Sequence, residues 1–213
     1  MIYDIDIAKQ IAKSLLQINA IILQPEKPFK WAAGWNSPIY CDNRKTLSYP
    51  EIRNYIRQGL ASIIRNHYKG ANTIAGVATA GIPHGALVAE ELGLPFIYVR
   101  NKTKEHGKEN QIEGDFNKGE SVVLVEDLIS SGKSSLEAAK TLTDSKMNVK
   151  GIVSIFNYNF DQAKQNFKNA NCDYISLCDF NTLIPEAIKS QYILESNLKI
   201  LEEWRKNPAK WKK

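Results

Sequence analysis

Two adjacent acids, followed by a loop of small residues, form the segment whose chemistry is easiest to derive. The apolar residues 122–125 lead into Glu126 and Asp127, and a helical stretch begins after the loop. A phosphate at that helix start would meet free backbone N–H groups and the positive end of the helix dipole. The two carboxylates could accept hydrogen bonds from sugar hydroxyls. We therefore expect a sugar-phosphate site, with further donors from Ser130, Ser131, Ser134 and the backbone at Gly132.

Two other interpretations of this segment are weaker. Gly132-Lys133-Ser134 is similar to the end of a nucleotide-binding P-loop, but that loop needs a glycine where Asp127 stands. An ordinary strand–turn–helix with serine caps would not explain two consecutive acids at the end of a buried strand. The sugar-phosphate interpretation is therefore preferred.

A run of cationic and titratable side chains follows the apolar residues 96–99. Four such groups occur within seven residues, and Gly107 ends the run: Arg100, Lys102, Lys104 and His106. A charged loop of this kind could close over an anionic substrate. The alternative is a solvated charge run without function.

Two further segments could contact a substrate. Residues 76–85 place a small-residue loop between a strand and a helix, where backbone amides can surround an oxygen-rich group; His84 within it is expected to be structural. Residues 29–44 are rich in aromatic side chains. Tyr40 could stack on a planar base and Arg44 could form a bidentate pair with a carboxylate, although an aromatic hairpin is also common as plain core.

The elements that must position these residues alternate along the chain. Five apolar runs predict buried strands at residues 73–77, 96–99, 122–125, 152–156 and 174–177, and helical stretches are expected at 82–92, 134–147 and 161–169, with a polar loop between Val99 and Val122. Such alternation predicts an α/β fold with a mostly parallel five-stranded sheet and helices on both faces. Ligands bind such sheets beyond the carboxyl ends of the strands, where the segments described above are expected.

The flanking regions add helices. The spacing of Ile7, Ile11 and Leu15 predicts an N-terminal helix after an aspartate cap. Pro50 is expected to open another helix, which closes before Gly70. One or two more helices are expected over residues 179–204, followed by a solvated, Lys-rich end.

Composition limits the class of protein. The chain has 213 residues, a net charge of +5 and a pI near 9.0, which suits a small anionic ligand but also nucleic acid. Its start is unlike a signal peptide, and no apolar run reaches the roughly 18 residues of a membrane span. Three cysteines without CxxC spacing argue against a disulfide framework or zinc site. A cytoplasmic protein is expected.

Over residues 29–157, the four segments resemble, in order, the motifs of the type I phosphoribosyltransferases, and the loop at Arg100 resembles that of the orotate phosphoribosyltransferases in particular. The matching elements are Glu126-Asp127 with its loop, Arg100, Lys104, His106-Gly107, Ile112-Glu113-Gly114, and the element Ser37-Pro38-Ile39-Tyr40 with Asp42 and Arg44. The chain departs from members of the family at Asn101, Lys133, Ala32 and Asn157.

The resemblance implies one domain over residues 1–213, in which residues 1–45 form a helix and a hood over the base. It implies transfer of a phosphoribosyl group from phosphoribosyl pyrophosphate (PRPP) to orotate, with Mg²⁺ carried by PRPP and pyrophosphate rather than by a set of protein ligands. The implied catalytic residues are Lys104, His106 and Asp127. The implied orotate-binding residues are Ser130, Tyr40 and Arg44. The implied PRPP-binding residues are Arg100, Lys104, His106, Glu126, Asp127, Leu128, Ile129, Ser130, Ser131, Gly132, Lys133 and Ser134.

The resemblance also implies a homodimer whose active-site loop reaches the neighbouring subunit, with no nucleic-acid or membrane partner. Two alternatives remain at this point. One is a purine phosphoribosyltransferase on the same scaffold. The other is a regulator that senses PRPP and binds nucleic acid, which the positive charge permits.

Overall fold

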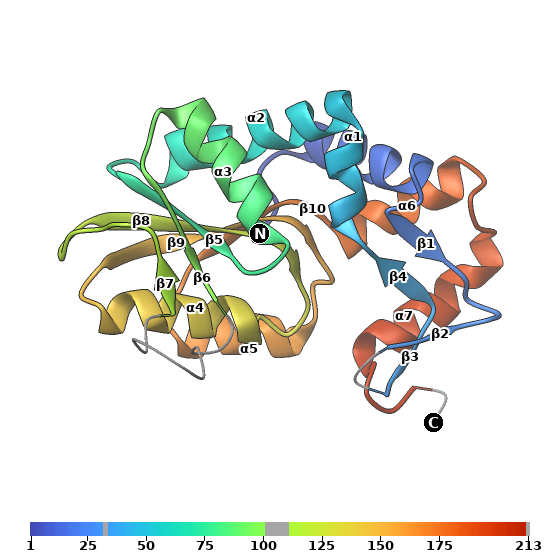
Figure 1. The fold of residues 1–213 in the computed structure, drawn as a ribbon. Coiled ribbons are helices and arrows are strands. Elements are labelled where there is room, and N and C mark those ends of the chain that lie inside the picture. Colours follow the sequence, from blue (N-terminus) through green and yellow to red (C-terminus); the bar gives the residue numbers. More distant parts are fainter. Residues whose placement is uncertain (32–33, 101–110, 212–213) are drawn as a thin grey trace.

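The computed structural model describes residues 1–31, 34–100 and 111–211. Its central sheet consists of β5 (Thr73–Val77), β6 (Phe96–Val99), β7 (Ile112–Glu113), β8 (Ser121–Ile129), β9 (Asn148–Asn157) and β10 (Tyr174–Asp179). The strands lie in the order β10-β9-β8-β5-β6-β7, and all neighbours are parallel except β6 and β7 (Figure 1). The α/β class and the mostly parallel sheet are confirmed.

The sequence predicts five strands, and the sheet has six. The additional strand, β7, is two residues long and lies in the stretch expected to be a polar loop. Ile112 is buried and pairs with Val99, while Glu113 pairs with Tyr98. Two residues are too few to show an alternation of polar and apolar side chains, so only pairing with β6 reveals this strand.

Helices cover both faces of the sheet, as expected. The helices α2 (Pro50–His67) and α3 (Gly81–Leu92) lie on one face, and α4 (Lys133–Asp144) and α5 (Asp161–Asn169) lie on the other (Figure 1). Because both faces are covered, the middle of β8 is completely buried at Val123, Leu124 and Val125. This burial explains why the strand is an unbroken apolar run rather than an alternating one.

The N-terminal helix α1 (Ile5–Gln17) begins at the predicted cap. The carboxylate of Asp4 accepts hydrogen bonds from the backbone N–H groups of Asp6 and Ile7, both at 2.9 Å. Pro50 opens α2, also as predicted, and His67 is exposed at its end. These local signals were sufficient because each acts within one turn of helix.

A smaller unit stands beside the sheet and is formed by both ends of the chain. Its elements are β1 (Ile21–Leu23), β2 (Phe29–Lys30), β3 (Asn36–Ser37), β4 (Ile39–Cys41), η1 (Asn43–Ser48), α6 (Phe180–Lys189), η2 (Glu195–Asn197) and α7 (Leu198–Lys206). The strand β1 pairs with β4 and β2 pairs with β3, both antiparallel. Figure 1 shows these strands next to α7.

Aromatic rings hold this unit together. The Trp31 ring lies 5.4 Å from that of Tyr158 and 5.8 Å from that of Trp204, centroid to centroid. Trp204 is fully buried, so α7 closes the core behind the hood. The chain end after Lys206 was expected to be solvated, but Trp211 packs against the core. Within the described ranges, none of the helices is long and apolar enough to cross a membrane.

Candidate active site

The strand β8 extends further than the sequence indicates, and both acids lie within the part of β8 that is paired with β9. On one side it pairs with β9 as far as Ile129, opposite Asn157. On the other side its pairing with β5 ends at Val125, opposite Gly76. The acids therefore project from a strand that is half open, rather than from the loop that follows it. Side chains normally alternate along a strand, but here the carboxyl groups of Glu126 and Asp127 lie close enough to share a hydrogen bond.

Glu126 points toward α4 and is 5% exposed. One of its carboxyl oxygens accepts a hydrogen bond from the Ser135 hydroxyl at 3.0 Å, and the other accepts from the backbone N–H of Asp127 at 3.0 Å. Burial, followed by the charge of Asp127, raises the pKa of Glu126 well above its ordinary value. Glu126 is thus the inner acid of the pair and the one that keeps its proton to higher pH.

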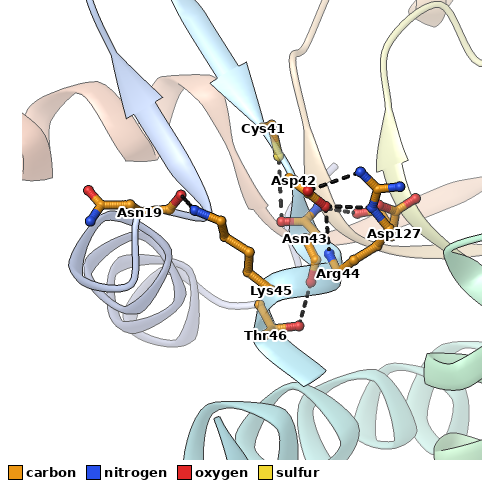
Figure 2. Close-up of polar contacts among 8 residues, drawn as sticks. All are labelled: Asn19, Cys41, Asp42, Asn43, Arg44, Lys45, Thr46 and Asp127. Carbon is orange, nitrogen blue, oxygen red and sulfur yellow. Dashed lines mark hydrogen bonds and ion pairs between the residues drawn. The ribbon is translucent and has the colours of Figure 1, made fainter. Parts of the chain in front are cut away.

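Asp127 is only partly buried and lies beside Asp42 and Arg44 of the hood (Figure 2). Burial raises the pKa of its carboxyl group, while the hydrogen bond with Glu126 and the charge of Arg44 lower it. Because the raising effects are stronger at Glu126, we assign the negative charge of the pair to Asp127. A carboxylate that is charged, fixed and partly open to solvent can accept hydrogen bonds from a diol or stabilise a nearby cation.

The loop after β8 has the features of a phosphate cradle. Gly132 has φ +76°, and a Cβ there would lie 2.5 Å from the Phe167 ring, so a side chain would be both strained and crowded. The N-cap residue of α4 is Gly132, which has no side chain to cap the helix, and the backbone N–H of Lys133 makes a long hydrogen bond of 3.4 Å to the Ser131 hydroxyl. The start of α4 can therefore present N–H groups to an anion. Ser130 and Ser131 are half-buried in this loop, and Ser134 is exposed on the first turn.

Three other residues of the predicted phosphate segment differ in which of their groups are accessible to a ligand. Ile129 is fully buried, so only its backbone is available, and Leu128 is partly buried. The ammonium group of Lys133 is exposed and lies 3.9 Å from the carboxylate of Glu137, a pairing that stabilises little at the surface. Lys133 is therefore free to turn toward a ligand.

A second helix start lies against the same end of β8. The loop after β5 leads into α3 at Gly81, where a Cβ would collide with the carbonyl oxygen of Val125. No side chain of the described residues caps α3 either. His84, in its first turn, is 2% exposed, and burial lowers its pKa to about 4. This burial supports the expected structural role for His84.

The cationic loop is described only at its start. The guanidinium of Arg100 lies 3.2 Å from the carboxylate of Glu113, and its backbone N–H donates to the Gln111 carbonyl at 2.8 Å. Lys104 and His106 lie outside the described residues, as does Lys102. Of this predicted set, the structure therefore reports only on Arg100.

The two hood residues expected at the base differ in availability. Tyr40 is 39% exposed, and its ring lies 5.6 Å from that of Phe29. Arg44 is exposed, but its Nε and Nη2 atoms donate to the carboxylate of Asp42 at 2.6 and 2.9 Å (Figure 2). A ligand carboxylate must use the other N–H groups of Arg44 or displace Asp42. Ala32 lies outside the described residues, whereas Asn157 is buried at the end of β9.

Two buried polar residues at the site escape the sequence analysis. Ser135 holds Glu126, as described above, and Asn43 donates from its side-chain amide to the carbonyl of Asp127 at 2.8 Å. Asn43 lies between Asp42 and Arg44 of the hood motif, which was the only signal for it, and Ser135 had none. A cavity of about 870 Å³ between α4 and α5 meets this site only at Ser131 and Lys133. Neither Glu126 nor Asp127 lines this cavity.

The chain is similar to phosphoribosyltransferases both in its family match and in the sequences of its relatives. Residues 48–189 match the family described as phosphoribosyl transferase domain. The chain is 54% identical over 205 residues to the orotate phosphoribosyltransferase of Cytophaga hutchinsonii, covering 96% of this chain and 98% of that protein. It is 46% identical over 207 residues to the orotate phosphoribosyltransferase of Listeria innocua, covering 97% and 99%.

Solved structures agree with these sequences. The orotate phosphoribosyltransferase of Aeropyrum pernix superposes with a TM-score of 0.75 at 25% identity, covering 86% of this chain and 99% of that chain. The UMP synthase of Leishmania donovani superposes with a TM-score of 0.79 at 28% identity, covering 93% of this chain and 42% of that one.

Proposed function

Because this chain belongs to the phosphoribosyl transferase family and to its orotate phosphoribosyltransferase members, we propose that the site around Asp127 carries out their reaction. The enzyme transfers the 5-phosphoribosyl group of PRPP to orotate, giving orotidine 5'-monophosphate and pyrophosphate in pyrimidine nucleotide biosynthesis. The observation that carries this proposal is the position of Asp127 at a strand end where two uncapped helix starts converge. One helix start suits the 5-phosphate and the other suits the pyrophosphate.

The chemical role of the acids follows from their surroundings. As N1 of orotate displaces pyrophosphate from C1 of the ribose, positive charge develops on the sugar ring. Asp127, which carries the charge of the acid pair, stabilises that developing cation and accepts hydrogen bonds from the ribose hydroxyls. Glu126, held by Ser135 and by the backbone, supports the same hydroxyls from the inner side. The catalytic task is mainly positioning and charge stabilisation.

The remaining roles complete the substrate site. The 5-phosphate binds the α4 start with Leu128, Ile129, Ser130, Ser131, Gly132, Lys133 and Ser134. The base lies under the hood formed within residues 1–45, where Tyr40 stacks on it, Arg44 meets its carboxylate and Ser130 contacts its edge. Tyr40 is accessible for this contact. The whole chain acts as one unit in this proposal, because a single hydrophobic cluster joins the sheet to residues of the hood.

The cationic loop acts on the leaving group. Arg100, Lys104 and His106 close over the pyrophosphate, stabilise its charge and exclude water that would hydrolyse PRPP. We further propose a homodimer in which this loop enters the neighbouring subunit's site.

Magnesium is part of the proposal as a companion of the substrate. The oxygen donors of Asp127 and of the neighbouring serines suit a hard cation. No cluster of three or more metal-binding side chains occurs in residues 1–31, 34–100 and 111–211, so an ion here would be held largely by the oxygens of PRPP and pyrophosphate. When bound, Mg²⁺ would neutralise phosphate charge.

The cellular setting completes the proposal. All three cysteines are free, which supports a reducing compartment such as the cytoplasm. We assign no nucleic-acid or membrane partner.

The test of this function is loss of orotate ultraviolet absorbance in the presence of PRPP and Mg²⁺. Turnover should require both, and Asp127→Asn should lower kcat at least about tenfold, which corresponds to some 1.4 kcal/mol of transition-state stabilisation. Turnover of adenine, guanine or hypoxanthine instead of orotate would identify a purine enzyme. PRPP binding without turnover, together with salt-dependent binding of nucleic acid, would favour the regulator.

The shared loop can be tested by mixing two variants of low activity, Asp127→Asn and Lys104→Ala. If the loop crosses to the neighbouring subunit, a mixed dimer contains one intact site, and an equal mixture should regain about a quarter of the wild-type activity. If each loop serves its own subunit, the mixture stays at the low activity of the separate variants.

A further inference from the structure

A buried amide links the hood to the backbone of Asp127. Asn43 is the first residue of η1 and is fully buried. Its Nδ2 donates a hydrogen bond to the Asp127 carbonyl at 2.8 Å, across 84 positions of sequence (Figure 2). The bond therefore joins the element that follows the hood strands to the strand that carries the reactive acid.

The carbonyl group of Asp127 is available for a hydrogen bond because β8 extends beyond the end of β5. β5 ends at Val77, and its pairing with β8 ends at Val125. Carbonyl groups two residues apart on a strand point to the same side, so that of Asp127 points, like that of Val125, toward the start of α3. Within the described part of the sheet, no strand continues there to bond it. A buried carbonyl without a donor is costly, and Asn43 supplies the donor.

The orientation of the Asn43 amide is determined by its partners. Its Oδ1 accepts a hydrogen bond from the Cys41 thiol at 3.5 Å, and its backbone carbonyl accepts one from the Thr46 hydroxyl at 2.6 Å (Figure 2). The Asp127 carbonyl can only accept a hydrogen bond, so the nitrogen end of the amide must face it. One residue earlier, Asp42 caps η1 through the backbone N–H of Arg44.

We propose that Asn43 is a positioning residue that holds Asp127 at the ribose and ties it to the hood residues Tyr40 and Arg44. This inference rests on the proposed function. The side chain of Asn43 bonds to Asp127, whereas at the start of α3 it is the backbone of Asn43 that interacts with His84. Substituting the side chain therefore affects the position of Asp127 rather than the phosphate cradles at α3 and α4. Loss of the amide should therefore impair the chemical step more than the binding of PRPP.

The test compares Asn43→Ala and Asn43→Asp with wild type in the orotate assay. Both variants should lower kcat at least about tenfold, since a small misplacement at a reacting centre is costly, while KM for PRPP changes less than about threefold. Asn43→Asp preserves the shape of the side chain and faces the carbonyl with an acceptor. Protonation restores its donor, so its kcat relative to wild type should rise as pH falls from 8 to 6, whereas that of Asn43→Ala should not.

Ser176→Ala is the matched control. It removes a buried side-chain hydrogen bond of 2.7 Å between Ser154 and Ser176. Ser154 is the β9 partner of Glu126, and Ser176 lies one strand further from the acids, on β10. This variant should melt at a lower temperature than wild type while its kcat stays unchanged.

Two outcomes would overturn the inference. One is a kcat within about twofold of wild type for Asn43→Asp, whose isosteric side chain keeps the fold testable even where Asn43→Ala does not fold. The other is a rise in KM for PRPP of about tenfold or more with no loss of kcat. If wild type itself does not consume orotate, the proposed function fails instead, which separates the two failures.

Discussion

Protonation of His84 should destabilise the protein in mild acid, and the variant His84→Asn should remove that sensitivity. The imidazole is 2% exposed, and its Nε2 has no hydrogen-bond partner among the described residues. Burial lowers its pKa from 6.5 to about 4, while the backbone of Asn43 acts weakly in the opposite direction. The folded protein therefore keeps His84 neutral at a pH where the unfolded chain binds a proton.

The sign and size of the change in unfolding free energy with pH follow from this difference in the pKa of His84. A histidine with a lowered folded-state pKa contributes its full stability above the unfolded value of 6.5 and loses it as pH falls toward 4. Each pKa unit corresponds to about 1.4 kcal/mol, so the total loss is about 3 kcal/mol, of which about 2 kcal/mol falls between pH 7.5 and 5. For a chain of this length, that is a drop in Tm of about 4–8 °C.

The assay is thermal unfolding of wild type and His84→Asn between pH 7.5 and 5. Asparagine leaves a small cavity, so the variant should be less stable at pH 7.5, and its deficit should shrink by about 2 kcal/mol at pH 5. Comparing the two proteins cancels the carboxyl groups that also titrate in this range. His67→Gln, which changes an exposed histidine, is the control. Parallel curves for wild type and His84→Asn would refute the reasoning.

Three further outcomes are expected. Glu126→Gln should raise Tm at pH 8, because the pKa of Glu126 is raised in the folded protein and its protonated form, which favours folding, is lost as pH rises. The gain in Tm should vanish near pH 4, and a gain that stays constant with pH would contradict this origin. Gly81→Ala should cost roughly 1–3 kcal/mol of unfolding free energy in denaturant titrations, because its Cβ would meet the Val125 carbonyl; unchanged stability would show that the loop yields. Lys104→Ala should lower kcat at least about tenfold, some 1.4 kcal/mol, in the orotate assay; unchanged kcat would remove the loop from the mechanism.

Local chemistry made much of the site predictable. The cap at Asp4, the proline at the start of α2 and the small-residue loop before α4 each act within a few positions of sequence. The apolar runs located all five longer strands because strands buried on both faces must be continuously apolar. The roles of Lys104 and His106 remain predictions, because both lie outside the described residues.

The tertiary structure alone decided how distant segments meet. A two-residue strand such as β7 has no periodicity of its own and exists only through its pairing with β6. The different environments of Glu126 and Asp127 depend on Ser135, whose hydroxyl donates to Glu126, and on Arg44 of the hood, whose charge acts on Asp127. The contact between Asn43 and Asp127 joins positions 84 residues apart. Sequence patterns report the preferences of neighbours along the chain, whereas these contacts arise only when folding brings separate elements together.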